Sequence, residues 1–262
     1  MGKLNRVGEE GINNFGSKMI ITKYNAFNDM EVYFPEYNWK AKHVQYGNFK
    51  IGNVKCPYEP RVYRVAYIGA GKYKPKENGR TTKCYEVWKN MLTRCYDAEY
   101  KKREPTYQGC EVCEEWHNFQ TFSEWFHKNY YEIPNEIMCL DKDILNKGNK
   151  IYSPETCVFV PKNINNLFTK RNNDRGNYPI GVYYKKNINK FIAQCSDIDD
   201  YGRKQRTYLG VFDNDKDAFK AYKSHKENII KETIDTYEGI IPEPTYSKLK
   251  DVMYNYKVEI ND

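Results

Sequence analysis

The sequence predicts an α+β protein made of several small modules, and three observations support that class. Short segments with strand-type alternation fill about the first 69 residues. Two stretches with helical apolar spacing follow, and strand-like segments then return ahead of two further helices. We expect a small β-rich N-terminal module, a central helical plus ββα module, and a C-terminal three-stranded sheet with one packed helix.

Four ranges follow from this pattern, and no internal repeat is evident. They are a barrel-like module at 1–69, the ββα module at 84–171, the sheet and helix at 178–235 and a last helix within 242–262. Strands of the first module are expected in "KMIITKY", "MEVYF", "NFKIG" and "VYRVAYIG". The Gly- and Lys-rich stretch "GAGKYKPKENGRTTK" has no apolar period and is expected to be a flexible connection.

Aromatic residues recur at helical spacing in the central module. The positions are Tyr85, Trp88, Leu92 and Cys95 in one stretch, and Trp116, Phe119, Phe122, Trp125 and Phe126 in the next. Rings on one helix face can either form a core or stack on bases. We favour the core, because a helical period is what burial of one face requires.

The C-terminal sheet is expected to have two chemically different faces. Strands are predicted at 180–185, 190–196 and 205–212, followed by a helix from Asp215 to about Lys231 with Asn214 as its N-cap. Strand alternation places Val182, Phe191, Ala193 and Leu209 toward the helix. It leaves Tyr183, Lys185, Gln194, Ser196, Arg206 and Tyr208 on the outer face, where such side chains suit a DNA major groove.

The same segment resembles an AP2-type DNA-binding domain. The motifs that carry the resemblance are Gly181-Val182, Lys190-Phe191-Ile192-Ala193, Tyr208-Leu209-Gly210-Val211-Phe212 and the helical run from Ala218 to Tyr222. The resemblance covers about 50 residues and implies that the sheet binds duplex DNA. Tyr183 stands where plant members of the family usually have an arginine, which leaves the base preference open.

Further basic residues precede and enter the sheet. The window 161–190 holds seven lysines and arginines against one acid, Asp174. The predicted DNA-binding residues are Lys170, Arg171, Arg175, Tyr183, Lys185, Lys186, Lys190, Gln194, Arg206 and Tyr208. The whole chain has 42 Lys and Arg against 35 Asp and Glu, with 25 tyrosines. That composition suits nucleic acid but also suits any basic soluble protein.

The middle of the chain resembles a family of phage and Firmicutes proteins that are described as HNH-like and that commonly carry an AP2-like tail. The matching residues are Tyr85-Glu86-Val87-Trp88, Met91, Arg94-Cys95-Tyr96, Val112-Cys113-Glu114-Glu115-Trp116, Phe119, Leu140 to Ile144 and Tyr152-Ser153-Pro154-Glu155. An HNH nuclease needs a histidine on its first strand to deprotonate water. No histidine lies between His127 and His225, so we lean against nuclease activity.

Acidic and amide side chains offer a weaker alternative. The period of two in a strand predicts that Asp141 and Asp143 share one strand face, and they could bind Mg²⁺ together with Asn163 or Asn166. An aspartate with an ordinary pKa is a poor base at neutral pH. We therefore favour the interpretation that both aspartates cap loops or pair with nearby lysines. A supercoiled plasmid that stays intact with Mg²⁺ or Mn²⁺ would eliminate the nuclease.

Zinc is not expected, and no cofactor is assigned. Cys110 and Cys113 have the spacing of half a zinc site, and Cys139 and Cys157 would have to complete it without forming a second C-x-x-C pair. No apolar leader or membrane-spanning stretch is evident, so a cytoplasmic location is expected, the host cytoplasm if a phage encodes the chain. The eight cysteines are then expected to be reduced.

Three functions remain open from the sequence. The first is a phage or mobile-element DNA-binding protein with an inactive HNH-like core. The second is a phage counter-defence protein that binds and inhibits a host defence complex, and the third is a metal-dependent homing-type endonuclease. A pulldown from host lysate with and without nuclease treatment separates a protein partner from a partner bridged by DNA.

Overall fold

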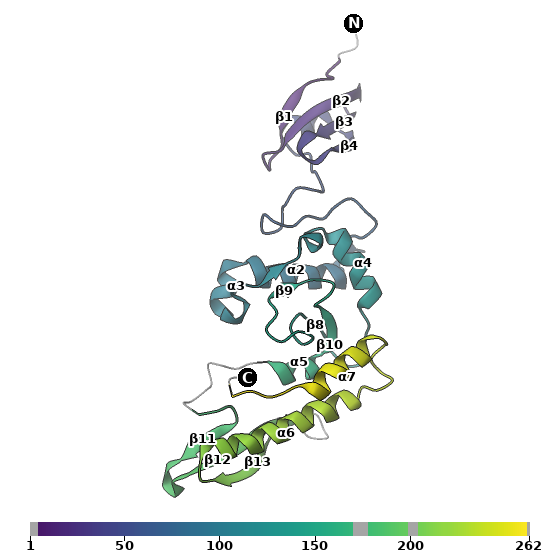
Figure 1. The fold of residues 1–262 in the computed structure, drawn as a ribbon. Coiled ribbons are helices and arrows are strands. Elements are labelled where there is room, and N and C mark those ends of the chain that lie inside the picture. Colours follow the sequence, from purple (N-terminus) through teal and green to yellow (C-terminus); the bar gives the residue numbers. More distant parts are fainter. Residues whose placement is uncertain (1–4, 170–177, 199–203, 261–262) are drawn as a thin grey trace. The chain divides into compact units, whose positions relative to one another are not determined.

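The computed structural model describes residues 5–169, 178–198 and 204–260 (Figure 1). Its contacts divide the chain into two compact units, Met1–Lys128 with Ile151–Ser153, and Asn129–Lys150 with Pro154–Asp262. Helices and several small sheets occur in both, which confirms the α+β class. Within the described ranges, no helix combines the length and the apolar character needed to cross a membrane.

The first unit begins with a four-stranded antiparallel sheet. Its strands are β1 (Glu10–Ile12), β2 (Lys18–Ala26), β3 (Asp29–Phe34) and β4 (Trp39–Val44), in that spatial order. Alternation along β3 buries Met30, Val32 and Phe34 in the module's core. The strands expected in "KMIITKY" and "MEVYF" are thereby confirmed.

The predictions of two other strands in this module are wrong. The segment "NFKIG" belongs mainly to helix α1 (Tyr46–Lys50), which buries Phe49 against the sheet's core. The segment "VYRVAYIG" turns at Tyr63 and Arg64, whose φ angles of 52° and 60° are left-handed, and it forms only isolated bridges. Alternation of apolar residues does not reveal such a turn.

The Gly- and Lys-rich stretch is more ordered than expected of a flexible connection. Strands β5 (Lys76–Glu77) and β6 (Arg80–Thr81) pair as a tight hairpin. The loop residues Asn78 and Gly79 both have positive φ, which is the geometry that an Asn-Gly hairpin turn requires.

A different kind of turn is shared by two other hairpins of the chain. It joins β3 to β4, and it also joins β11 (Val182–Lys185) to β12 (Lys190–Ile198). Each loop is a three-residue 3-10 turn followed by a left-handed asparagine, Asn38 or Asn189. Each asparagine side chain accepts a hydrogen bond from a tyrosine five residues earlier, Tyr33 or Tyr184. The spacing Y-x4-N therefore marks one loop design used twice.

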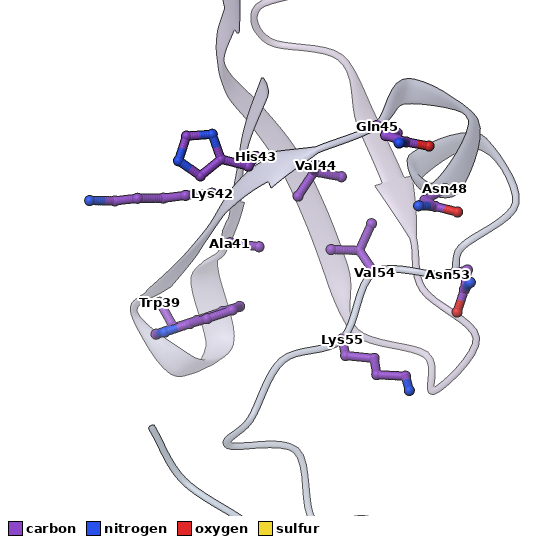
Figure 2. A pocket seen from close by; sticks show the side chains of 10 residues that line it. All are labelled: Trp39, Ala41, Lys42, His43, Val44, Gln45, Asn48, Asn53, Val54 and Lys55. Carbon is purple, nitrogen blue, oxygen red and sulfur yellow. The ribbon is translucent and has the colours of Figure 1, made fainter. Parts of the chain in front are cut away.

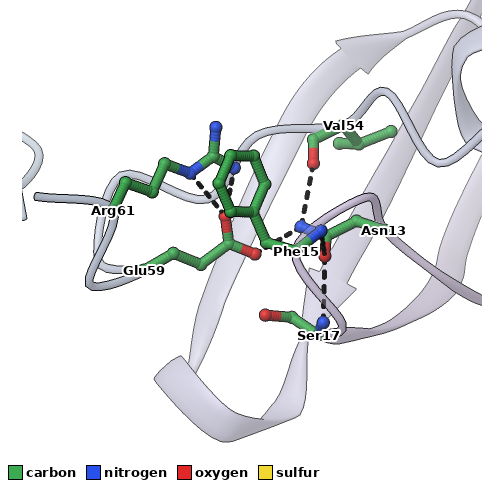
Figure 3. A network of polar contacts seen from close by, with 6 residues as sticks. All are labelled: Asn13, Phe15, Ser17, Val54, Glu59 and Arg61. Carbon is green, nitrogen blue, oxygen red and sulfur yellow. Dashed lines mark hydrogen bonds and ion pairs between the residues drawn. The ribbon is translucent and has the colours of Figure 1, made fainter. Parts of the chain in front are cut away.

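A polar network fixes the segment after the first sheet (Figure 3). The Glu59 carboxylate is 98% buried and accepts hydrogen bonds from Arg61, 2.8 Å from its Nε, and from the amide of Asn13. Asn13 also donates to the Val54 carbonyl at 3.2 Å. The Arg61 guanidinium lies 3.6 Å from the centre of the Phe15 ring. The buried carboxylate of Glu59 therefore has both a cationic partner, Arg61, and an amide donor, Asn13.

Helices and short strands complete the first unit. They are α2 (Lys83–Tyr96), α3 (Ala98–Arg103), β7 (Glu111–Val112), α4 (Phe119–Asn129) and β9 (Ile151–Tyr152), and β7 pairs with β9 in parallel. Trp88, Trp116 and Phe119 are completely buried, and the Trp88 indole donates to the Trp116 carbonyl at 2.7 Å. The aromatic stripes are therefore core, as predicted. Trp116 lies in a separate 3-10 turn that precedes α4.

The second unit contains the strand-loop-strand-helix element. Strands β8 (Met138–Asp141) and β10 (Val158–Pro161) pair antiparallel, and α5 (Lys162–Phe168) follows directly. The three strands β11, β12 and β13 (Lys204–Phe212) form an antiparallel sheet in that order. Helices α6 (Asp215–Asp235) and α7 (Thr245–Asn255) lie side by side after the sheet (Figure 1).

Helix α6 contributes side chains to two hydrophobic cores. Its first half buries Tyr222 against Cys195 of β12, together with Val258 from the C-terminal segment. Its second half buries Ile230 and Ile234 in a cluster with Val158, Val160 and Ile164 of β10 and α5, to which α7 adds Tyr246, Leu249 and Met253. One 21-residue helix thereby connects the sheet and the strand-loop-strand-helix element within this unit.

Candidate nucleic-acid interface

The outer face of the sheet β11–β13 is the strongest candidate site. Cys195 packs on α6, so the regular alternation of β12 turns Ile192, Gln194 and Ser196 to the opposite side. Tyr183 pairs with Ile192, and Tyr208 pairs with Gln194, so both tyrosines lie on this outer face. They are 41% and 61% exposed.

An extra residue in β13 preserves this arrangement. Ala193 pairs with Gly210 and Gln194 pairs with Tyr208, which leaves Leu209 without a partner across the strands as a β-bulge. Leu209 packs with the helix-side core, while Tyr208 and Val211 remain on the outer face. A β-bulge was not foreseen, because the sequence alone does not show where one strand gains a residue.

The predicted cations differ in how available they are. Lys185, Lys186 and Arg206 are exposed, and none of them has a carboxylate partner among the described residues. Lys190 forms an ion pair with Asp213. Lys170, Arg171 and Arg175 lie outside the described residues. The described face therefore offers Lys185, Lys186 and Arg206 beside the amide of Gln194.

The predicted pair of aspartates does not share a strand face. Strand β8 ends at Asp141, and Asp143 lies in the following loop. The Asp141 carboxylate accepts hydrogen bonds from the backbone amides of Asp143 at 2.8 Å and of Ile144 at 2.7 Å. Asp143 forms an ion pair with Lys142 at 3.2 Å. The expectation of a shared face is wrong, because the carboxylate turns the chain out of the strand at this point.

The loop after β8 is closed by its own polar groups. Lys142 is buried, and its ammonium donates to the carbonyl of Asn149 at 3.0 Å. The Asn149 side chain donates back to the Lys142 carbonyl at 2.7 Å. Burial and, second to it, the nearby Asp143 carboxylate together raise the pKa of Asp141 to about 6.

The helix asparagines do not join this loop through any hydrogen bond among the described residues. Asn163 and Asn166 are exposed on α5. The hydroxyl group of Tyr237, near Asn163, donates a hydrogen bond to Glu136 at 2.9 Å. Burial and the bond to Glu136 raise the pKa of Tyr237 to about 12. Tyr237 and Glu136 were missed, since they lie 101 residues apart and carry no common motif.

Cysteine and carboxylate positions give no metal centre in the part of the chain that the structure describes. No group of three or more His, Cys, Asp or Glu side chains is arranged there to hold a metal ion. Cys110 and Cys113 belong to the first unit, whereas Cys139 and Cys157 belong to the second. None of these four cysteines forms a disulfide.

A shallow groove of about 500 Å³ lies beside β4 in the first unit (Figure 2). The side chains of Val44 and Val54 point toward each other across it, and Gln45, Asn48 and Lys55 lie around it. None of the predicted site residues lines this groove. It is open along its length, unlike the enclosed pockets that bury most of a small ligand.

The Asp141 turn allows a prediction about pH. The folded pKa of about 6 exceeds the value of about 3.9 for an unfolded aspartate, so the folded state binds this proton more tightly. Stability from this group is complete below about pH 4 and is lost as pH rises toward about 6. Asp141→Asn keeps the oxygen acceptor without the charge. We expect it to remove this loss and to stabilise the second unit at pH 7 by up to about 3 kcal/mol.

Urea unfolding followed by circular dichroism at about pH 4 and about pH 7 measures the effect. The Asp141→Asn variant should match the wild type at the lower pH and exceed it at the higher pH. Asp141→Ala removes the acceptor for both amides and should be less stable than Asp141→Asn at both pH values. If the stability of the wild type and of Asp141→Asn changed with pH in the same way, the pKa of Asp141 would not be raised in the folded state.

Comparisons with family models, curated proteins and solved structures found no match to this chain. The class that the fold and the site define is therefore a mixed α and β protein with several small sheets, one of which exposes a basic and aromatic face.

Proposed function

We propose that this protein binds double-stranded DNA through the face of β11–β13 that is turned away from α6. The observation that carries the proposal is the composition of that face. Its described strand residues include two exposed tyrosines, two exposed cations and one amide, and none is acidic. A small antiparallel sheet can enter a major groove, where Lys and Arg reach guanine or phosphate and Gln reaches adenine.

The packing behind the sheet supports this use. Tyr222 and Ala218 of α6 are buried beneath the strands, so the outer face is held rigid from behind. Rigid positioning matters because only side chains that are already ordered bind bases without a large entropy cost. In this proposal the β8–β10–α5 element is a structural support for α6, since its aspartates and lysines bond within their own loop.

Removal of two outer-face cations tests the proposal. The Lys185→Ala, Arg206→Ala double variant should bind a random-sequence duplex at least tenfold more weakly than the wild type at low salt. It should also reduce the slope of log affinity against log salt by about 2, since two phosphate or base contacts are lost. Fluorescence anisotropy with a labelled duplex at several salt concentrations measures both quantities.

The matched control removes two cations from the other side of the second unit. Lys216 and Lys220 are exposed on α6, and the Lys216→Ala, Lys220→Ala variant has the same net charge as the test variant. It should retain most of the affinity. Equal binding by the two double variants would show that the face of β11–β13 does not contact DNA.

A further inference from the structure

An apolar row crosses the outer face of the sheet. Tyr183, Ile192 and Val211 are direct cross-strand neighbours on β11, β12 and β13. Ile192 is only 3% exposed, whereas Val211 is 44% exposed beside it. Tyr208, which is 61% exposed, continues the apolar surface on the other side of the β-bulge. The part of the face nearest the middle of the sheet is therefore hydrophobic.

The polar groups of this face lie at its ends. Lys185 and Lys190 are paired across β11 and β12 toward the hairpin turn, and Ser196 and Arg206 are paired at the opposite end. Lys190 is neutralised by Asp213. Between these ends, only Gln194 offers an amide. Two exposed aromatic rings and an exposed valine thus occupy the positions between the cations.

Only one base presents an apolar group in the major groove. Thymine carries a C5 methyl there, whereas guanine and cytosine present acceptors and a donor that need polar partners. A guanine or cytosine edge placed against Val211 and the face of the Tyr183 ring, away from its hydroxyl group, would lose its hydration without gaining a hydrogen bond. A thymine methyl placed there would be removed from water at no such cost.

We propose that this sheet recognises A·T-rich duplex DNA by burying thymine methyl groups against Tyr183, Tyr208 and Val211. This inference rests on the proposed DNA binding and adds the class of sequence to it. Gln194 suits the adenine of a neighbouring pair, and Arg206 suits a guanine at the end of the site. The tyrosine at position 183 then selects a base that an arginine there would not select.

Replacement of thymine by uracil tests the methyl contact with little other change in the bases. One random duplex library is prepared with thymine and a second with uracil, and the full-length protein is titrated against both at one fixed salt concentration. Sequences recovered from the thymine library should be rich in A·T pairs. Their uracil versions should bind about fourfold more weakly for each methyl that is buried.

Variants assign the effect to the apolar row. The Tyr208→Ala, Val211→Ala variant keeps Tyr183 alone of the three side chains, so it should prefer thymine over uracil less strongly than the wild type while it retains salt-dependent binding. Ile188 is 43% exposed at the tip of the hairpin and outside the row, so Ile188→Ala should keep the preference for thymine.

The possible failures are distinguishable. Equal affinity of the wild type for thymine and uracil duplexes, or recovery of G·C-rich sequences, overturns the methyl recognition and leaves DNA binding in place. Absence of binding to every duplex overturns the proposed function and this inference together. A preference for thymine that is as strong in the Tyr208→Ala, Val211→Ala variant as in the wild type overturns the assignment to these side chains.

Discussion

Replacement of Glu59 by alanine is expected to destabilise the first unit by about 3 kcal/mol, because it breaks a buried ion pair from one side. The variant leaves the Asn13 amide buried with one acceptor fewer, and it leaves the Arg61 guanidinium without its carboxylate. Arg61 is 22% exposed, so part of its charge can regain water and the loss stays below the upper range for such pairs.

Tryptophan fluorescence during urea unfolding measures this loss directly. All four tryptophans lie in the first unit, at positions 39, 88, 116 and 125, so the signal reports that unit alone. Glu59→Gln keeps the shape and should fall between Glu59→Ala and the wild type. Glu36→Ala, at an exposed position in the turn before β4, is the control and should change the midpoint little. Equal midpoints for Glu59→Ala and Glu36→Ala would refute the role of the network.

The Ile234→Ala variant is expected to lose about 3 kcal/mol of stability in the second unit, since Ile234 is completely buried and alanine leaves a cavity. The loss of stability should appear in both parts of the second unit and not only around position 234. Because α6 contributes to both cores, amide protons of β8, β10 and α5 should exchange faster together with those of β11–β13.

Hydrogen exchange followed by mass spectrometry separates this outcome from a local one. Glu232 is exposed on the same helix, and Glu232→Ala should leave the exchange of both regions unchanged. Faster exchange confined to α7 and the end of α6 would mean that the two cores are stabilised independently. In that case the strand-loop-strand-helix element would not support the sheet.

Elements with a strong local signal were predictable from the sequence. The strands of the C-terminal sheet were expected at 180–185, 190–196 and 205–212 and are found at Val182–Lys185, Lys190–Ile198 and Lys204–Phe212. Asn214 caps α6 as expected, by accepting from the Asp217 amide at 2.9 Å. The end of α6 was placed too early, because its last turns are stabilised by packing on α7 and β10, which no local pattern contains.

The sequence predicted which side chains lie on the outer face of the candidate site, but it did not predict the apolar surface that they form together. Alternation alone assigned Tyr183, Gln194 and Tyr208 to the outer face, since successive side chains of a strand point to opposite sides. It did not reveal that Val211 also lies there, because the β-bulge at Leu209 shifts the alternation of β13. The apolar row therefore appears only when the three strands are paired.

Sequence by itself determined the α+β class, the aromatic cores and the placement of Tyr183, Gln194 and Tyr208 on the outer face. These features depend on side-chain spacing and backbone preference over a few residues. Tertiary structure alone decided that Asp141 turns a loop, that Glu59 is paired within a core, and that α6 joins the sheet to the strand-loop-strand-helix element. Each of these depends on groups brought together by folding, and burial then sets which charges must find a partner.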